Sequence, residues 1–171
     1  CAHVLFDQPI SRSLCEEFYQ AALAVGAKAH LGGTYLCIEG PQLSTKAESL
    51  LHKSWGVDVV GMTNATEARL VREAEISYAT MAMVTDYDCW KESDEPFSAE
   101  KIVATFARNV ETAKRAIACA VSRYDESRHR ADPARHALDG AILTPFEAVG
   151  PHARQRLEVI CSRLWAYPKQ I

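Results

Sequence analysis

The side chains best able to do chemistry stand directly after two short apolar runs. Thr63 follows the run 57–62, and Asp86 and Asp88 follow the run 76–84. If both runs are strands of an open α/β sheet, these polar groups stand at the strand ends, where ligands bind in such folds. The pattern therefore predicts one binding site built from both segments.

Asp86 and Asp88 are two residues apart, so both carboxyl groups point to the same side of an extended chain. Adjacent negative charges favour protonation of one partner, which makes a general acid feasible at neutral pH. The alternative is a solvated turn with two capping aspartates. Composition alone favours that alternative, because aspartate is among the commonest turn residues.

Thr63 precedes a predicted helix, so its hydroxyl and the free N–H groups of the first turn are suited to an anion such as phosphate. The alternative is a threonine that only caps the helix, and the spacing by itself favours the cap. Taken singly, His3 is typical of a structural histidine, and Leu43 and Met62 are typical of core residues.

Composition narrows the class of protein. The chain has 171 residues, 48% hydrophobic content and a formal charge of −3, with basic and acidic residues interspersed. These values predict one domain that binds a small molecule rather than nucleic acid or a membrane. Since there is no long apolar run and no signal-peptide layout, the expected location is the cytoplasm. The six cysteines form no C-x-x-C pair, which predicts reduced, mostly buried thiols and no metal site.

Periodicity and capping signals predict an α/β fold, because short apolar strands alternate with amphipathic helices. Thr45 and Glu48 have the spacing of a capping box, and Ser98 is placed to cap a long helix. Residues 122–140 are polar and interrupted by Pro133, which predicts a long loop or linker. The remaining expected elements are strands at 2–6, within 27–38, at 57–62 and at 76–84, and helices at 10–25, 45–55, 64–74 and 151–165.

Three segments together resemble the 5′-methylthioadenosine phosphorylases of the trimeric purine nucleoside phosphorylase family: IEGPQLSTKAE (38–48), WGVDVVGMT (55–63) and AMVTDYDCWK (82–91). The resemblance runs in register over residues 2–120. It implies that residues 1–171 are the C-terminal part of a single domain with a three-layer α/β/α fold and a central mixed sheet. The N-terminal half is then either missing or carried by a separate, cleaved chain that acts as a partner.

The resemblance also implies a reaction, the phosphorolysis of 5′-methylthioadenosine with inorganic phosphate as co-substrate and no other cofactor. Asp86 matches the catalytic residue at purine N7, and Asp88 matches a residue near the exocyclic amino group. Relatives that act on 6-oxopurines carry asparagine at the position of Asp86 and glutamate at that of Ser44. Both differences favour adenine, because a hydroxyl donor suits adenine N1 and carboxylate acceptors suit an amino group.

Further contacts follow from the resemblance. Thr63 matches a phosphate contact, Met62 packs against the ribose, and Thr85 lies next to the base. Gln42-Leu43 replaces the usual Arg-Phe, so Leu43 offers the base and ribose less area than a ring. An apolar slot for the methylthio group is expected from Ala99, Ile102 and Val103, reached by His3 of a neighbouring subunit in a homotrimer.

Two alternatives remain at this point. One is a phosphorylase of 6-oxopurine nucleosides or of methylthioinosine, which Asp86 and Ser44 disfavour. The other is a nucleoside-binding module without catalysis, which is conceivable because the glycine-rich strand and the Arg-His phosphate contacts of the family do not occur in this sequence.

Overall fold

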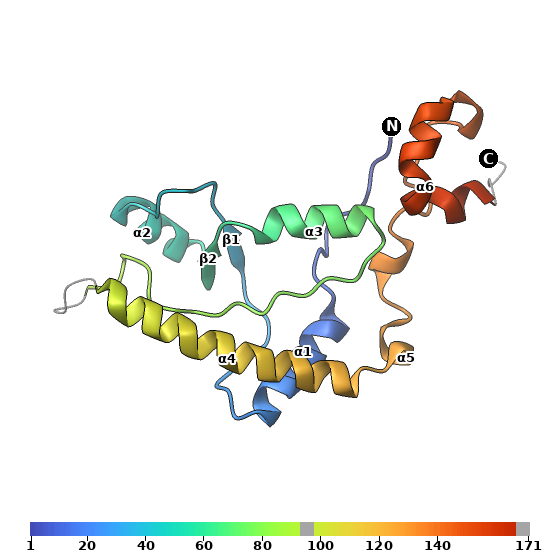
Figure 1. The fold of residues 1–171 in the computed structure, drawn as a ribbon. Coiled ribbons are helices and arrows are strands. Elements are labelled where there is room, and N and C mark those ends of the chain that lie inside the picture. The colour runs from blue at the N-terminus through green and yellow to red at the C-terminus, as the bar shows by residue number, and fades with distance from the viewer. Residues whose placement is uncertain (93–97, 167–171) are drawn as a thin grey trace.

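Helix α1 (Arg12–Ala24) runs antiparallel to the longer helix α4 (Ala99–Arg123) in Figure 1. The computed structural model describes residues 1–92 and 98–166. The two helices pack against each other, and each contains buried alanines, such as Ala21 in α1 and Ala116 in α4. Both predicted helices are confirmed, and the Ser98 hydroxyl caps α4 by accepting a hydrogen bond from the Lys101 amide.

A βαβ unit carries the first half of the predicted site. Strand β1 (Tyr35–Cys37) leads through α2 (Lys46–Ser54) to β2 (Val59–Gly61), and the two strands pair in parallel. The predicted capping box is confirmed: the Thr45 hydroxyl accepts from the Glu48 amide at 3.3 Å, and the Glu48 carboxylate accepts from the Thr45 amide at 2.7 Å. These bonds lower the pKa of Glu48. Within the described residues the sheet has these two strands.

The segment after α3 (Asn64–Glu73) is not the strand that its apolar sequence predicts. Residues 76–84 run back past α4 towards α2 without a ladder partner (Figure 1). Their carbonyls bond elsewhere: the Val84 oxygen accepts from the Asn109 side chain at 2.9 Å. Ile76 and Val84 are 53% and 61% exposed, so coverage on both faces is also wrong.

Two other expected strands are shorter than predicted or absent from the described structure. Residues 2–6 contribute one isolated antiparallel bridge, from Ala2 to Ile142. Of the range 27–38, three residues form β1. Gly32 and Gly33 precede it with φ values of 83° and 115°, which are incompatible with a regular extended ladder at those positions.

Residues 122–140 are a compact, partly buried unit, so the prediction of a loop or linker was wrong. They contain α5 (Glu126–His129) and the short 3₁₀ helix η1 (Pro133–His136). His129 is 2% exposed and Leu138 is 5% exposed. This segment is therefore part of the folded core.

Capping explains why these residues are so polar. The Asp125 carboxylate accepts from the Ser127 amide, and the Asp132 carboxylate accepts from the Ala134 amide, each at 2.9 Å. Burial raises the pKa of Asp132, but hydrogen bonds from Ser11 and the Ala134 amide outweigh it and hold that pKa below its ordinary value. The polar side chains satisfy short helix ends rather than marking a solvated linker.

The cysteines are all free. This confirms the expectation of unpaired thiols, but "mostly buried" was wrong, since Cys161 alone is buried among the six while Cys1 and Cys89 are exposed. No helix among the described residues is long and apolar enough to cross a membrane.

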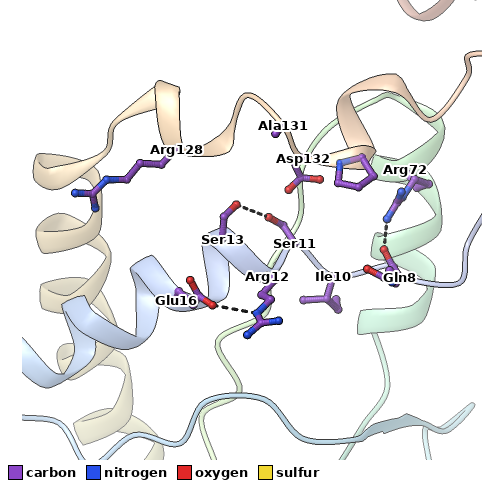
Figure 2. Close-up of a pocket in the computed structure, with 11 residues that line it drawn as sticks. Gln8, Ile10, Ser11, Arg12, Ser13, Glu16, Arg72, Arg128, Ala131 and Asp132 are labelled. Atoms are coloured by element: carbon purple, nitrogen blue, oxygen red, sulfur yellow. Dashed lines mark hydrogen bonds and ion pairs between the residues drawn. The ribbon is translucent and has the colours of Figure 1, made fainter.

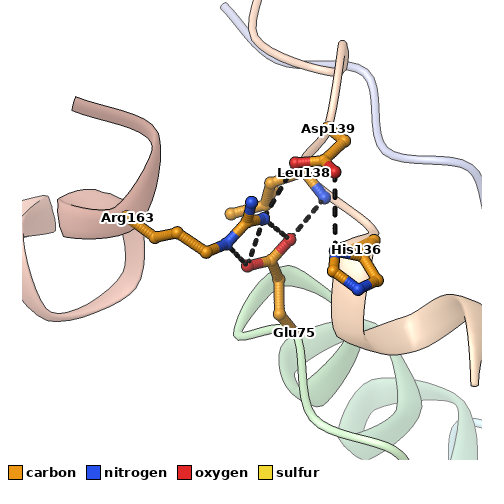
Figure 3. A network of polar contacts seen from close by, with 5 residues as sticks. All are labelled: Glu75, His136, Leu138, Asp139 and Arg163. Atoms are coloured by element: carbon orange, nitrogen blue, oxygen red, sulfur yellow. Dashed lines mark hydrogen bonds and ion pairs between the residues drawn. The ribbon is translucent and has the colours of Figure 1, made fainter. Parts of the chain in front are cut away.

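The last helix, α6 (Pro151–Ala166), follows the 3₁₀ turn η2 (Phe146–Ala148) and is tied to α3 by the ionic cluster in Figure 3. Arg163 contacts the Glu75 carboxylate at 2.7 Å and the Asp139 carboxylate at 2.9 Å. Glu75 also accepts from the Leu138 amide at 3.0 Å. One arginine thus joins the end of α3, the turn after η1 and α6.

Replacing Arg163 with alanine is expected to loosen α6. Because the guanidinium is 45% exposed, the loss is about 1 kcal/mol, or roughly fivefold in local opening. Limited proteolysis should then cut within α6 several times faster. Arg12→Ala is the matched control, since Arg12 pairs with Glu16 at 3.1 Å on the exposed face of α1. Equal cleavage rates in the two variants would show that Arg163 does not hold α6.

Candidate functional site

Three segments that are distant in sequence meet beside α2. The turn 38–44 joins the end of β2 through a hydrogen bond from the Ile38 amide to the Gly61 carbonyl, at 2.8 Å. The loop 84–92 joins the same turn through the Cys89 thiol, which contacts the Ser44 carbonyl at 3.4 Å. These contacts place side by side the three segments that carry Leu43, Ser44, Met62, Thr63, Thr85, Asp86 and Asp88. That these side chains form one site remains a prediction.

Close packing at two glycines fixes the backbone between β2 and α3. A Cβ at Gly61 would lie 1.8 Å from the Tyr35 hydroxyl oxygen, and one at Gly40 would lie 2.6 Å from the Met62 sulfur. No larger residue fits either position without rearrangement. Burial raises the pKa of Tyr35 above its ordinary value. Met62 and Thr63 are presented from this rigid corner.

Thr63 occupies the position before the first turn of α3, yet its side chain makes no capping hydrogen bond among the described residues. The helix begins at Asn64, whose side chain instead pairs with the Thr80 hydroxyl. Thr63 is exposed. The spacing favoured a capping role for the Thr63 hydroxyl, and the structure shows no such bond within the residues that it describes.

The two aspartates of the loop have different environments. Asp86 is exposed and accepts from the Thr85 hydroxyl at 2.5 Å. Asp88 is half-buried; its Oδ1 accepts from the Cys89 amide at 2.9 Å, while its Oδ2 is buried with no hydrogen-bond partner in the described structure. An unpaired buried carboxylate oxygen is costly, and a donor supplied from outside the chain removes that cost.

The first turns of α4 carry the predicted apolar slot. Ala99 and Val103 are exposed and Ile102 is half-buried. The Asn109 side chain ties this helix to the Val84 carbonyl, directly before Thr85. The assignment of these three apolar residues to a 5′-substituent remains a prediction.

Two predicted residues stand out by exposure and position. Leu43 is 73% exposed, so its side chain is available for contact rather than buried in the core. The N-terminus lies near α6 in Figure 1, on the other side of the molecule from α2. The His3 amide donates a hydrogen bond to the Ala141 carbonyl at 2.9 Å. Within this chain the structure does not bring His3 to the other site residues.

Two cavities among the described residues lie away from these segments, and sequence analysis did not predict them. One, of about 360 Å³, opens at the start of α1 near Arg72 and Asp132 (Figure 2). A second, of about 680 Å³, is lined by residues that include Glu17 and His129. None of the predicted site residues lines either cavity. Their walls come from several distant segments, which leave no local sequence pattern.

The candidate site thus combines an exposed carboxyl, a buried unpaired carboxylate oxygen and an uncapped helix start. Asp86 is accessible to a ligand that needs a proton donor or acceptor, and Asp88 suits a ligand N–H group. Thr63 and the start of α3 suit an anion. Such a set fits a ligand with an amino group bound next to an anion such as phosphate.

Known proteins resemble this chain closely. It is 47% identical over 159 residues to the S-methyl-5′-thioadenosine phosphorylase of Geobacter sulfurreducens, covering 93% of this chain and 55% of that protein. It is 45% identical over 177 residues to the enzyme of the same name from Gloeobacter violaceus, covering 99% and 58%. The chain therefore spans little more than half the length of these relatives.

Solved structures agree. A crystal structure of methylthioadenosine phosphorylase from an Antarctic soil metagenomic library superimposes with a TM-score of 0.81 at 35% identity, over 93% of this chain and 56% of that one. The Schistosoma mansoni methylthioadenosine phosphorylase in complex with adenine gives 0.66 at 27% identity, over 81% and 56%. The family profile described as "Phosphorylase superfamily" matches residues 2–122. With most of its length inside that profile, and with an α/β fold shared with these enzymes, the chain belongs to the phosphorylase superfamily.

Proposed function

We propose that these residues form the nucleoside-binding half of an enzyme that cleaves 5′-methylthioadenosine with phosphate, giving adenine and 5-methylthioribose 1-phosphate. The observation that carries the proposal is the loop 85–88, which presents an exposed Asp86 and a buried, unpaired Asp88 oxygen next to Ser44. The names of the relatives, methylthioadenosine phosphorylases, support the same substrate.

Asp86 acts in the bond-breaking step. As the glycosidic bond breaks, electrons move onto the purine, and a carboxyl group that gives or shares a proton at N7 stabilises the departing base. Phosphate then bonds to the anomeric carbon as the sugar gains positive character. The exposure of Asp86 leaves its carboxyl accessible to a base placed beside the loop.

Asp88 and Ser44 set the preference for adenine. The unpaired Asp88 oxygen accepts a hydrogen bond from the 6-amino group, whereas a 6-oxo group offers it only another acceptor. The Ser44 hydroxyl donates to N1. A site built to hydrogen-bond one of these groups discriminates against the other by roughly 10⁴-fold.

Phosphate binds at Thr63, whose hydroxyl is not used to cap α3. Because the chain spans 55–58% of the length of its relatives, the proposal includes an N-terminal half that supplies the remaining phosphate contacts. The proposed assembly is a cytoplasmic homotrimer in which His3 reaches a neighbouring site. The other proposed contacts are Leu43 and Met62 with base and ribose, Thr85 with the base, and Ala99, Ile102 and Val103 with the methylthio group.

The test is an assay of free-base release by the full-length protein, containing both halves, with and without inorganic phosphate: adenine is measured from methylthioadenosine, and hypoxanthine from inosine and methylthioinosine. Methylthioadenosine, inosine and methylthioinosine are compared as substrates. Phosphate-dependent release from methylthioadenosine, with little turnover of the two 6-oxopurine nucleosides, is the expected result. Faster turnover of inosine or methylthioinosine would show that the substrate is a 6-oxopurine nucleoside instead. Binding of a nucleoside without release of its base would show that the protein is a nucleoside-binding module.

A further inference from the structure

A buried serine on α2 joins that helix to the loop that carries the two aspartates. Ser49 is 1% exposed, and its hydroxyl oxygen accepts a hydrogen bond from the Trp90 amide at 3.1 Å. The two residues are 41 positions apart in sequence. Neither Ser49 nor Trp90 is among the predicted site residues, and the proposed reaction gives Ser49 no role.

Other contacts between α2 and the loop are more exposed. The Lys53 ammonium lies 3.5 Å from the centre of the Trp90 ring, and Lys46 pairs with Glu92 at 3.1 Å, with side chains 60% and 87% exposed. Exposed ion pairs contribute little, because water competes for both partners. The Ser49 bond is different, since loss of its acceptor leaves an N–H group next to a side chain that water does not reach.

The Trp90 amide lies two residues after Asp88, and the Lys91 amide closes the turn by donating to the Asp88 carbonyl at 3.1 Å. Asp88 keeps one carboxylate oxygen buried and unpaired. A loop free to move would turn that oxygen towards water, because burial without a partner is unfavourable. The backbone around Asp88 must therefore be held by contacts elsewhere, and the bond to Ser49 is the most deeply buried of those found between the loop and α2.

Ser49 also connects the loop 84–92 to Ser44, through helix α2. Helix α2 starts two residues after Ser44, and Ser49 lies one turn into it. The bond from Ser49 to the loop therefore restrains the distance from Ser44 to Asp88, together with the contact of the Cys89 thiol with the Ser44 carbonyl. Those two residues are the proposed partners of adenine N1 and of the 6-amino group.

We propose that Ser49 is a positioning residue for base selection. Through the Trp90 amide it holds Asp88 in place opposite Ser44, so that an amino group fits between them and an oxo group does not. This role rests on the proposed phosphorylase function. It concerns a residue that touches neither nucleoside nor phosphate.

The test compares Ser49→Ala with Ser54→Ala in the full-length protein. Ser54 is the matched control, because it lies on the same helix and its exposed hydroxyl donates to the Leu51 carbonyl at 2.7 Å. Both changes remove one hydroxyl from a residue of α2 and replace serine by a better helix former. Two quantities are measured: amide hydrogen exchange in residues 84–92, and the ratio of kcat/KM for methylthioadenosine to that for methylthioinosine.

In Ser49→Ala, exchange of the loop amides is expected to accelerate about tenfold and the selectivity ratio to fall about tenfold, mainly through a higher KM for methylthioadenosine. The melting temperature should match that of Ser54→Ala to within a few degrees. A general loss of stability would lower kcat for both substrates alike and leave their ratio unchanged, so the ratio separates positioning from damage to the fold.

Two results would overturn the proposal, and they distinguish failure of the Ser49 role from failure of the phosphorylase function. If the wild-type protein releases adenine but both serine variants keep its selectivity, the positioning role of Ser49 is wrong and the phosphorylase function stands. If the wild-type protein shows no phosphate-dependent release, the proposed function fails and the role of Ser49 in base selection fails with it. The exchange rates then report only whether the Trp90 bond orders the loop.

Discussion

Replacing Asp86 with alanine in the full-length protein is expected to lower kcat for adenine release by about 10²- to 10⁴-fold. The alanine cannot protonate or share a proton with the departing purine, so negative charge develops on the base without compensation. Because Asp86 is exposed, its removal should leave the melting temperature nearly unchanged. Steady-state release of adenine, followed by chromatography, measures the effect.

Two further variants sharpen this result. Asp86→Asn keeps the shape of the side chain and is expected to lose activity on adenine nucleosides while gaining relative activity on 6-oxopurine nucleosides, since an amide can both donate and accept hydrogen bonds. Asp7→Ala removes another exposed carboxylate outside the site and should behave as wild type. A kcat for Asp86→Ala within threefold of that of Asp7→Ala would remove Asp86 from the mechanism.

A methyl group at Gly61 is expected to disrupt the corner between β2 and α3. Its carbon would lie 1.8 Å from the Tyr35 hydroxyl oxygen and 2.6 Å from the ring carbon that bears it, so the ring or the strand must move. Overpacking of this kind costs about 1–3 kcal/mol. Since Met62 and Thr63 follow directly, KM for phosphate should rise as well. Urea unfolding and phosphate titration measure the two effects.

Two controls accompany the Gly61→Ala variant. Gly150→Ala should be close to neutral, because a Cβ at Gly150 meets no atom within 4 Å. The double variant Gly61→Ala/Tyr35→Leu removes the clashing hydroxyl and ring, so it should be less destabilised than the sum of the two single variants. Equal urea midpoints for Gly61→Ala and Gly150→Ala would mean that the strand yields without cost.

Local signals in the sequence predicted most helices correctly. The capping box of Thr45 and Glu48 and the cap at Ser98 involve residues within one turn of each other, so no distant part of the chain is needed to form them. The expected helix at 10–25, which is α1, also follows from the spacing of residues close in sequence. Membership of the phosphorylase superfamily, expected from the motifs, is confirmed over residues 2–122.

The errors fall where structure depends on distant partners. An apolar run such as 76–84 forms a strand only if a neighbouring strand pairs with it, and the described structure gives its carbonyls other donors, including the Ser11 amide on Tyr78. Residues 122–140 are polar because aspartates cap short helices there, a use of polar groups that composition does not distinguish from solvation.

For the site, the sequence by itself determined which side chains are present and, through its motifs, which segments carry them. The tertiary structure alone decided three further points. Within the described part of the chain, the Thr63 hydroxyl makes no capping hydrogen bond, and Ser49 bonds to the loop 84–92. Asp86 is exposed, whereas one carboxylate oxygen of Asp88 is buried without a hydrogen-bond partner in the described structure. The physical reason is that burial and hydrogen-bond partners are properties of groups brought together across the chain, whereas spacing reports only on neighbours within a turn or strand.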